Sequence, residues 1–175
     1  VAKGGARPWE SEPVGFAVVG LGMGHSRSKQ IASTPGTKLV GVADLVEERA
    51  QRTGEALGVP RTTDFRELLD NDAVEVVMVM TETGNHAEVA LQALEAGKHV
   101  LTTKPMETSV EKCDAMIRKA DEQGLLLAVD FDRRHTVGVN TLKAAVERGA
   151  FGKLLAGSFT LKILRLMDYF NANGG

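Results

Sequence analysis

Three glycines alternate with other residues in the segment from residue 20 to residue 24, directly after a short apolar run. Gly20 would permit a tight turn there, and Gly22 would let the backbone approach a phosphate group closely. A helix beginning at this point would add amide groups and a partial positive charge. The segment is therefore predicted to bind a pyrophosphate through Gly20, Leu21, Gly22, Met23 and Gly24.

A carboxylate follows at the end of the second apolar run, where Asp44 lies 20 residues after Gly24. A carboxylate in this position can accept hydrogen bonds from both ribose hydroxyls of an adenosine. It would repel a 2′-phosphate, and the next residues, Leu45 and Val46, provide no arginine to bind one. Asp44 therefore favours a dinucleotide site for NAD, with NADP the less favoured cofactor.

The glycine pattern departs from the dinucleotide fingerprint at one position. The fingerprint is G-x-G-x-x-G, and His25 stands where the third glycine is expected. The pattern G-x-G-x-G before an acid also suits methyltransferases that bind S-adenosylmethionine, and a glycine-rich turn need bind nothing. The context between a strand and a helix favours the dinucleotide over these two alternatives.

Lys104 stands at the end of a later apolar run, residues 98–103, and Pro105 follows it. Proline prevents the strand from continuing and restricts the preceding lysine to extended geometry. Ligands bind at this end of parallel strands. A lysine there can exchange a proton with a substrate hydroxyl or carbonyl while a hydride moves, so Lys104 is the candidate general acid/base. The alternative is a surface lysine at a strand end.

The elements that would position these residues alternate along the chain. Apolar runs typical of buried strands lie at 14–20, 38–44, 75–81, 98–103 and 125–131, with helical patterns between them. Strands that are apolar on both faces indicate a parallel sheet covered by helices on both sides. The predicted fold class is α/β, with a Rossmann-type doubly wound sheet over residues 14–131 and a flexible tail over residues 1–13.

Composition excludes several other classes of protein. The chain has 175 residues, 43% hydrophobic and 25% charged, which is typical of a globular protein. A net charge of -2 argues against nucleic acid or a membrane surface as a partner. Cys113 is the single cysteine, so an internal disulfide is excluded, and residues 1–13 lack the apolar core of a secretory signal. These features predict a cytoplasmic location.

The combined motifs resemble the glucose–fructose oxidoreductase / inositol 2-dehydrogenase / MocA family over roughly residues 14–165. The resemblance rests on VVGLGMG, Asp44, Thr81, His86 before ALEAGKHVL, Lys104-Pro105, Arg134 and LKAAVERGAFGKL. It implies an NAD(P)-dependent oxidoreductase that acts on CH–OH groups of a small sugar, polyol or related hydroxy compound. The two alternatives from other classes are a non-catalytic NAD-binding or redox-sensing module and the methyltransferase.

The resemblance also assigns residues to the nicotinamide end of the site. In the family, the lysine of a Glu-Lys-Pro turn helps in catalysis and the turn closes the nicotinamide pocket, which implies these roles for Lys104 and Pro105. Thr103 replaces the glutamate of that turn. Thr81 is expected to contact the cofactor, and His86 either lines the pocket or satisfies the start of a helix.

The resemblance implies a second domain as well. Arg134 is expected to contact the cofactor or that domain, or else to pair with Asp130 or Asp132. Residues 132–175 are expected to hold a connecting helix and the first strand, within 153–166, of an incomplete α+β domain for substrate binding and oligomerisation. That strand would be an exposed edge, so a homo-oligomer through the second-domain sheet is predicted. No metal site is expected.

Overall fold

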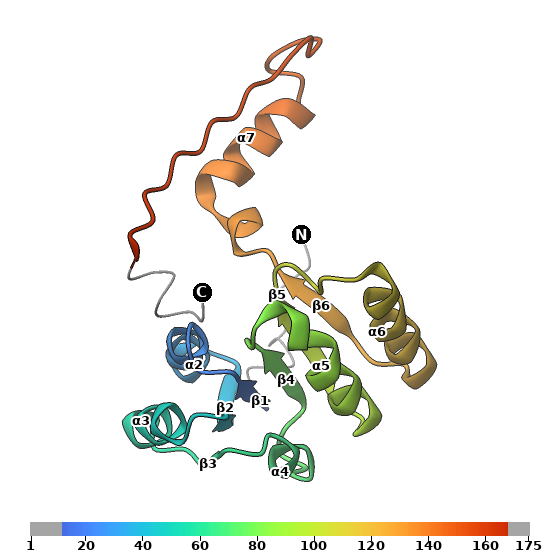
Figure 1. Cartoon of the computed structure of the whole chain (residues 1–175). Helices are drawn as coiled ribbons and strands as arrows, with labels where there is room; N and C mark the ends of the chain where they lie inside the picture. Colours follow the sequence, from blue (N-terminus) through green and yellow to red (C-terminus); the bar gives the residue numbers. More distant parts are fainter. Residues whose placement is uncertain (1–11, 168–175) are drawn as a thin grey trace. The chain divides into compact units, whose positions relative to one another are not determined.

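The computed structural model of the chain describes residues 12–167 (Figure 1). The chain divides into two compact units, and the boundary in the sequence lies between Asp130 and Phe131. Most of the predicted flexible tail lies outside the described residues, as do residues 168–175.

The first unit is built on a six-stranded parallel sheet. The strands are β1 (Val14–Val19), β2 (Thr37–Ala43), β3 (Arg61–Thr62), β4 (Val76–Val79), β5 (His99–Thr103) and β6 (Leu127–Asp130). Their order across the sheet is β3-β2-β1-β4-β5-β6, which is the order of a doubly wound dinucleotide-binding sheet. The predicted fold class is thereby confirmed. The two-residue β3 was not predicted, because so short a strand carries no apolar pattern.

Helices cover both faces of this sheet (Figure 1). Helices α2 (Gly24–Ser33) and α3 (Glu47–Leu57) pack on one face, while α4 (Arg66–Leu69), α5 (His86–Glu95) and α6 (Val110–Gln123) pack on the other. Alternate strand residues supply the two cores: Val77 and Val79 belong to the α5 and α6 side, and Met78 belongs to the α2 side. The runs are apolar on both faces because both faces are buried.

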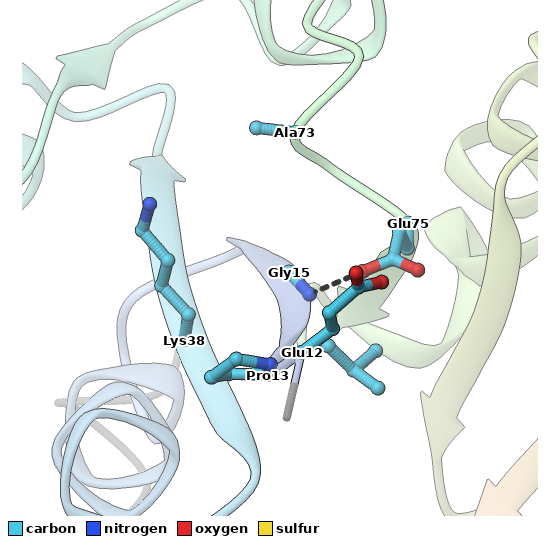
Figure 2. A pocket seen from close by; sticks show the side chains of 7 residues that line it. Glu12, Pro13, Gly15, Lys38, Ala73 and Glu75 are labelled. Carbon is cyan, nitrogen blue, oxygen red and sulfur yellow. Dashed lines mark hydrogen bonds between the residues drawn. The ribbon is translucent and has the colours of Figure 1, made fainter. Parts of the chain in front are cut away.

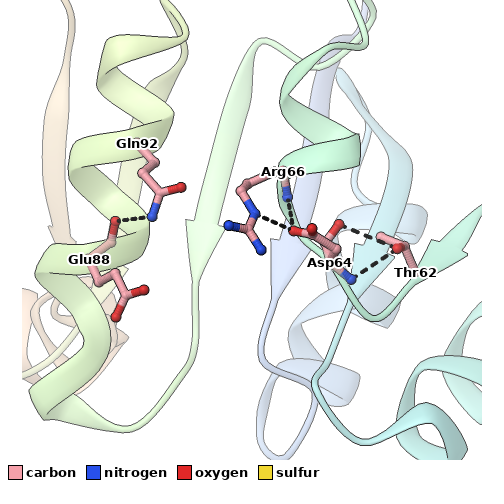
Figure 3. Close-up of polar contacts among 5 residues, drawn as sticks. All are labelled: Thr62, Asp64, Arg66, Glu88 and Gln92. Atoms are coloured by element: carbon pink, nitrogen blue, oxygen red, sulfur yellow. Dashed lines mark hydrogen bonds and ion pairs between the residues drawn. The ribbon is translucent and has the colours of Figure 1, made fainter.

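Side chains bond to backbone amides at two helix starts, within residues 64–67 and 108–112. At the first, the Asp64 carboxylate accepts hydrogen bonds from the Arg66 backbone and guanidinium, as Figure 3 shows, and these bonds lower the Asp64 pKa. At the second, the hydroxyl of Ser109, not of Thr108, accepts from the Lys112 amide at 3.4 Å and caps α6. The amide and hydroxyl of Thr108 instead donate to the Glu107 carboxylate.

The second unit contains the short 3-10 helix η2 (Asp132–His135) and helix α7 (Val137–Glu147). The strand predicted within residues 153–166 is not formed, because these residues pair with no other strand among those described and a strand needs a partner for its amide and carbonyl groups. The incomplete second domain and the homo-oligomer stay predictions. Within residues 12–167, no helix is both long enough and apolar enough to cross a membrane.

The packing of α5 against the sheet can be tested by substitution of a core residue. Leu94 is fully buried between α5 and the sheet, so Leu94→Ala is expected to lower the free energy of unfolding by about 2–5 kcal/mol. Leu126→Ala is the matched control, since Leu126 is 72% exposed and should change stability by about 0.5 kcal/mol or less. Urea denaturation measures both. Equal losses in the two variants would contradict the described packing.

Candidate site at the carboxyl edge of the sheet

The predicted site residues follow the carboxyl ends of four parallel strands. The register pairs Val19 with Ala43 on one side and Val79 on the other, and Val79 with Thr102. The segments after β1, β2, β4 and β5 therefore start at one edge of the sheet. The strand order reverses between β1 and β4, which is the crevice where open α/β sheets bind ligands.

The three glycines after β1 have three different environments. Gly20 has a φ of +91°, and a Cβ there would lie 2.6 Å from the Met80 carbonyl carbon and from the Thr81 nitrogen. A Cβ at Gly24 would lie 3.2 Å from the Met80 Cβ. A Cβ at Gly22 would meet no atom within 4 Å. Gly20 thus makes the turn, Gly24 lets α2 approach the sheet, and Gly22 leaves open space.

These environments account for the departure from the fingerprint. The third glycine of the fingerprint serves close helix–strand packing, and Gly24 meets that need one residue early. His25 is then available for another contact: its Nδ1 lies 2.9 Å from the hydroxyl of Thr53 and links α2 to α3. Burial, and then the charges of Lys29 and Arg52, lower the pKa of His25. The His25 contact is therefore structural.

Asp44 joins the end of β2 to the glycine loop. Its carboxylate is 8% exposed and accepts hydrogen bonds from the Leu21 amide at 2.6 Å and the Val46 amide at 2.8 Å. Each carboxylate oxygen has one protein donor and can accept another. Leu45 and Val46 are exposed, so the surface beside the carboxylate is apolar. Asp44 can therefore hold the loop and still accept a hydrogen bond from a ligand hydroxyl group.

Thr81 offers an unused polar atom at the same edge. Its hydroxyl oxygen is buried and has no hydrogen-bond partner among residues 12–167. Buried polar atoms normally have partners, so an orphan beside a crevice fits a ligand contact. No side chain caps the start of α2. The Ser26 amide donates to the Met23 carbonyl, whereas the Gly24 and His25 amides make no hydrogen bond among the described residues and are available. The open Gly22, the Asp44 carboxylate, the α2 amides and Thr81 together fit a dinucleotide.

The Lys104-Pro105 turn follows β5 and contains a cis peptide bond. Lys104 is exposed, and its amine makes no hydrogen bond or ion pair with another described residue. His86 is fully buried against this turn: Nδ1 lies 3.1 Å from the Pro105 carbonyl oxygen and 3.2 Å from that of Met106. Nε2 lies 2.9 Å from the Thr81 carbonyl oxygen. The geometry therefore gives no support to direct contact between the His86 ring and a cofactor.

Glu107 is a residue of this region that sequence reasoning missed. It is 7% exposed, and its carboxylate accepts from the Ala87 amide at 2.9 Å and the Thr108 amide at 2.7 Å. Burial raises the pKa of Glu107, but the hydrogen bonds from Thr108 and Ala87 and the charge of Lys112 together outweigh it, so the pKa is lowered overall. The sequence held no local signal for this role, because Ala87 lies 20 residues away.

Arg134 belongs to the second unit, where its guanidinium lies 4.9 Å from the centre of the Phe131 ring. Its contact with a cofactor stays a prediction. Asp130, one of its suggested partners, pairs with Arg27 at 2.9 Å. Residues 12–167 contain no group of three or more His, Cys, Asp or Glu side chains placed to hold a metal ion.

A hollow at the opposite edge of the sheet has a structural explanation. Glu12, Lys38 and Glu75 line it near the amino ends of β1, β2 and β4, as Figure 2 shows. The Glu75 carboxylate accepts from the Gly15 amide at 2.8 Å. A Cβ at Gly15 would lie 1.8 Å from the Ala73 carbonyl oxygen, so Gly15 is needed for packing. This edge is not the one where such sheets bind ligands.

Sheet order and glycine loop together define a dinucleotide-binding Rossmann domain. The sequence model of the Gfo/Idh/MocA family, described as an oxidoreductase family with an NAD-binding Rossmann fold, matches residues 14–131. The chain belongs to this family, as its motifs predicted.

Three proteins with known activities or bound cofactors are similar to this chain. Scyllo-inositol 2-dehydrogenase (NAD(+)) from Bacillus subtilis (strain 168) is 33% identical over 78% of this chain and 41% of its own length. The WlbA dehydrogenase from Bordetella pertussis, solved with NADH and UDP-GlcNAcA, is 28% identical with a TM-score of 0.75, over 81% of this chain and 44% of that one. A 3-ketoreductase from Actinomadura kijaniata, solved with NADP, is 29% identical with a TM-score of 0.74, over 81% and 46%. The chain spans less than half the length of each.

The glycine environments predict opposite outcomes for two similar variants. Gly20→Ala is expected to lose more than about 1–2 kcal/mol of stability, because alanine is strained at this φ and its methyl group meets backbone atoms. Gly22→Ala should stay within about 0.5 kcal/mol of the unmodified chain, because its methyl group meets nothing. Thermal and urea unfolding measure both. A large loss in Gly22→Ala would show that the protein itself requires that glycine.

Proposed function

We propose that this chain binds NAD at the carboxyl edge of the sheet and is the cofactor-binding portion of an oxidoreductase. The observation that carries the proposal is the open space at Gly22 beside a carboxylate already bonded to the same loop. The loop from Gly20 to Gly24 and the first amides of α2 would hold the pyrophosphate. Asp44 would hold the adenosine ribose, and the Thr81 hydroxyl would contact the cofactor near its nicotinamide end.

The preference for NAD over NADP rests on the surroundings of Asp44. Its carboxylate would repel a 2′-phosphate, and the adjacent exposed side chains, Leu45 and Val46, carry no positive charge to attract one. Similar proteins were solved with NADH and with NADP, so the proposed preference is specific to the residues around Asp44 in this chain. A carboxylate with a free acceptor position on each oxygen suits the two ribose hydroxyls of NAD.

For the chemical step, we propose Lys104 as the group that moves the proton. Bound nicotinamide supplies the hydride acceptor or donor. In the oxidation direction the neutral Lys104 amine takes the proton of a substrate hydroxyl, and in reduction its ammonium returns a proton to the carbonyl oxygen. The position of Lys104 after β5, exposed and without a side-chain partner among the described residues, suits such an exchange.

The substrate class follows from the family and its named members. Relatives include an inositol dehydrogenase, and we propose that the substrate here is likewise a small sugar, polyol or related hydroxy compound. Such a substrate presents a carbinol carbon to the nicotinamide and a hydroxyl to Lys104. Residues outside the Rossmann unit would hold the remaining hydroxyl groups.

Calorimetric titration tests the cofactor half of this proposal. NADH should bind, NADPH should bind more weakly, and S-adenosylmethionine should not bind. Asp44→Asn should weaken the binding of NADH about tenfold or more, because hydrogen bonds to a charged group are lost. The difference in affinity between NADH and NADPH should become smaller. Asp121→Asn on α6 is the control and should change neither. Equal affinity for NADH and NADPH in the unmodified chain would contradict the preference, and binding of S-adenosylmethionine alone would end the dehydrogenase proposal.

Turnover tests the catalytic half, in the longest natural chain that contains these residues. Lys104→Met should lower the rate of NAD reduction with inositols or sugars about 100-fold or more, because the proton transfer is lost. The dissociation constant for NADH should change much less. Lys38→Met is the control, because Lys38 lies at the opposite edge of the sheet. Full activity in Lys104→Met would remove Lys104 from the mechanism, and cofactor binding without turnover on any of these compounds would favour a non-catalytic module.

A further inference from the structure

The Lys104 side chain has no partner among the described residues, so the backbone that carries it must set its position. The segment from residue 104 to 107 belongs to neither a helix nor a strand. Two buried side chains hold it, His86 from the start of α5 and Glu107 from the segment itself. Neither has a role in the proposed binding of the cofactor.

The His86 ring joins two strand ends. It bonds to the Thr81 carbonyl after β4 on one side, and to the Pro105 and Met106 carbonyls after β5 on the other. All three partners are carbonyl oxygens, which only accept hydrogen bonds. A neutral imidazole carries one N–H and can donate to one side, whereas an imidazolium donates to both. A phenyl ring of similar shape would leave all three oxygens without a donor.

Glu107 makes the reciprocal connection from the turn to α5. One carboxylate oxygen accepts from the Ala87 amide in the first turn of α5, and the other accepts from the amide and hydroxyl of Thr108. The first amides of a helix have no partner within the helix, and its positive end favours a carboxylate. The turn therefore caps α5, while the first residue of α5 bonds to the turn.

We propose that His86 and Glu107 form a clamp that fixes the backbone of residues 104–107 against α5 and thereby places the Lys104 amine at the cofactor edge. Both are positioning residues, which act through Lys104 and do not touch the reacting atoms. The clamp itself rests on contacts within this chain. Its effect on Lys104 rests on the proposed function of that residue.

Hydrogen exchange on the cofactor-free chain tests the clamp directly. The Ala87 and Thr108 amides donate to Glu107, so Glu107→Gln and His86→Phe should each speed their exchange about tenfold or more, the effect of losing about one hydrogen bond. Exchange at Val77 and Met78 in β4 should stay unchanged. His86→Gln keeps a donor for one side, so it should fall between the unmodified chain and His86→Phe. His99→Phe, at the other end of β5, is the matched control and should leave both amides unaffected.

Acylation of Lys104, followed by mass spectrometry with and without NADH, tests its positioning. NADH should protect Lys104 in the unmodified chain and in His99→Phe, and should protect it much less in His86→Gln and Glu107→Gln at equal NADH occupancy. Lys98 is an internal reference for folding, because its amine is buried on Asn71 and reacts only if the sheet opens.

The outcomes separate the two proposals. Unchanged exchange at Ala87 and Thr108 in His86→Phe and Glu107→Gln would overturn the clamp, whether or not NADH binds. Faster exchange with equal protection of Lys104 in all variants would overturn its positioning role. Failure of the unmodified chain to bind NADH would overturn the proposed function alone, since the exchange of the cofactor-free chain would still decide the clamp.

Discussion

The hydrogen bond from the Leu21 amide to the Asp44 carboxylate fixes the loop on which the candidate site depends. The loop follows β1 and the carboxylate follows β2, so the bond requires that these neighbouring strands be parallel and in register at Val19 and Ala43. The Leu21 side chain is fully buried, which holds the same residue from its other side. The loop therefore has its shape before any ligand arrives, and a ligand that fits it does not bear the entropic cost of ordering it.

The same hydrogen bond explains why the three glycines of the loop have different structural roles. Once Leu21 is held by Asp44, Gly20 must turn the chain sharply against Met80, and Gly24 must begin α2 close to β1 and β4. Both are requirements of the protein. Gly22 meets no such requirement and leaves open space in the loop, which suits the close approach of the proposed pyrophosphate. Two glycines that the fold needs therefore flank one whose open side fits the proposed ligand.

Much of this arrangement was predictable from sequence, and the remainder was not for physical reasons. Buried parallel strands are continuous apolar runs, so β1, β2, β4 and β5 were recognisable, and glycines such as Gly124, with a φ of +65°, end helices by a local rule. The segment 153–166 has strand composition but no partner to pair with in the structure. The clamp could not be predicted from sequence because its contacts join residues 19 and 20 positions apart, and no local sequence pattern indicates such contacts.

The two ends of the candidate site are held by one kind of interaction, a buried side chain bonded to the backbone of another strand's connection. Asp44 holds the glycine loop in this way, and His86 holds the turn after β5. Such contacts fix where a backbone lies without depending on the side chains of the segment that is held. The side chains of a segment held in this way can vary while its backbone stays in place, whereas Gly20, Asp44 and His86 turn or hold the backbone and are constrained by their own contacts.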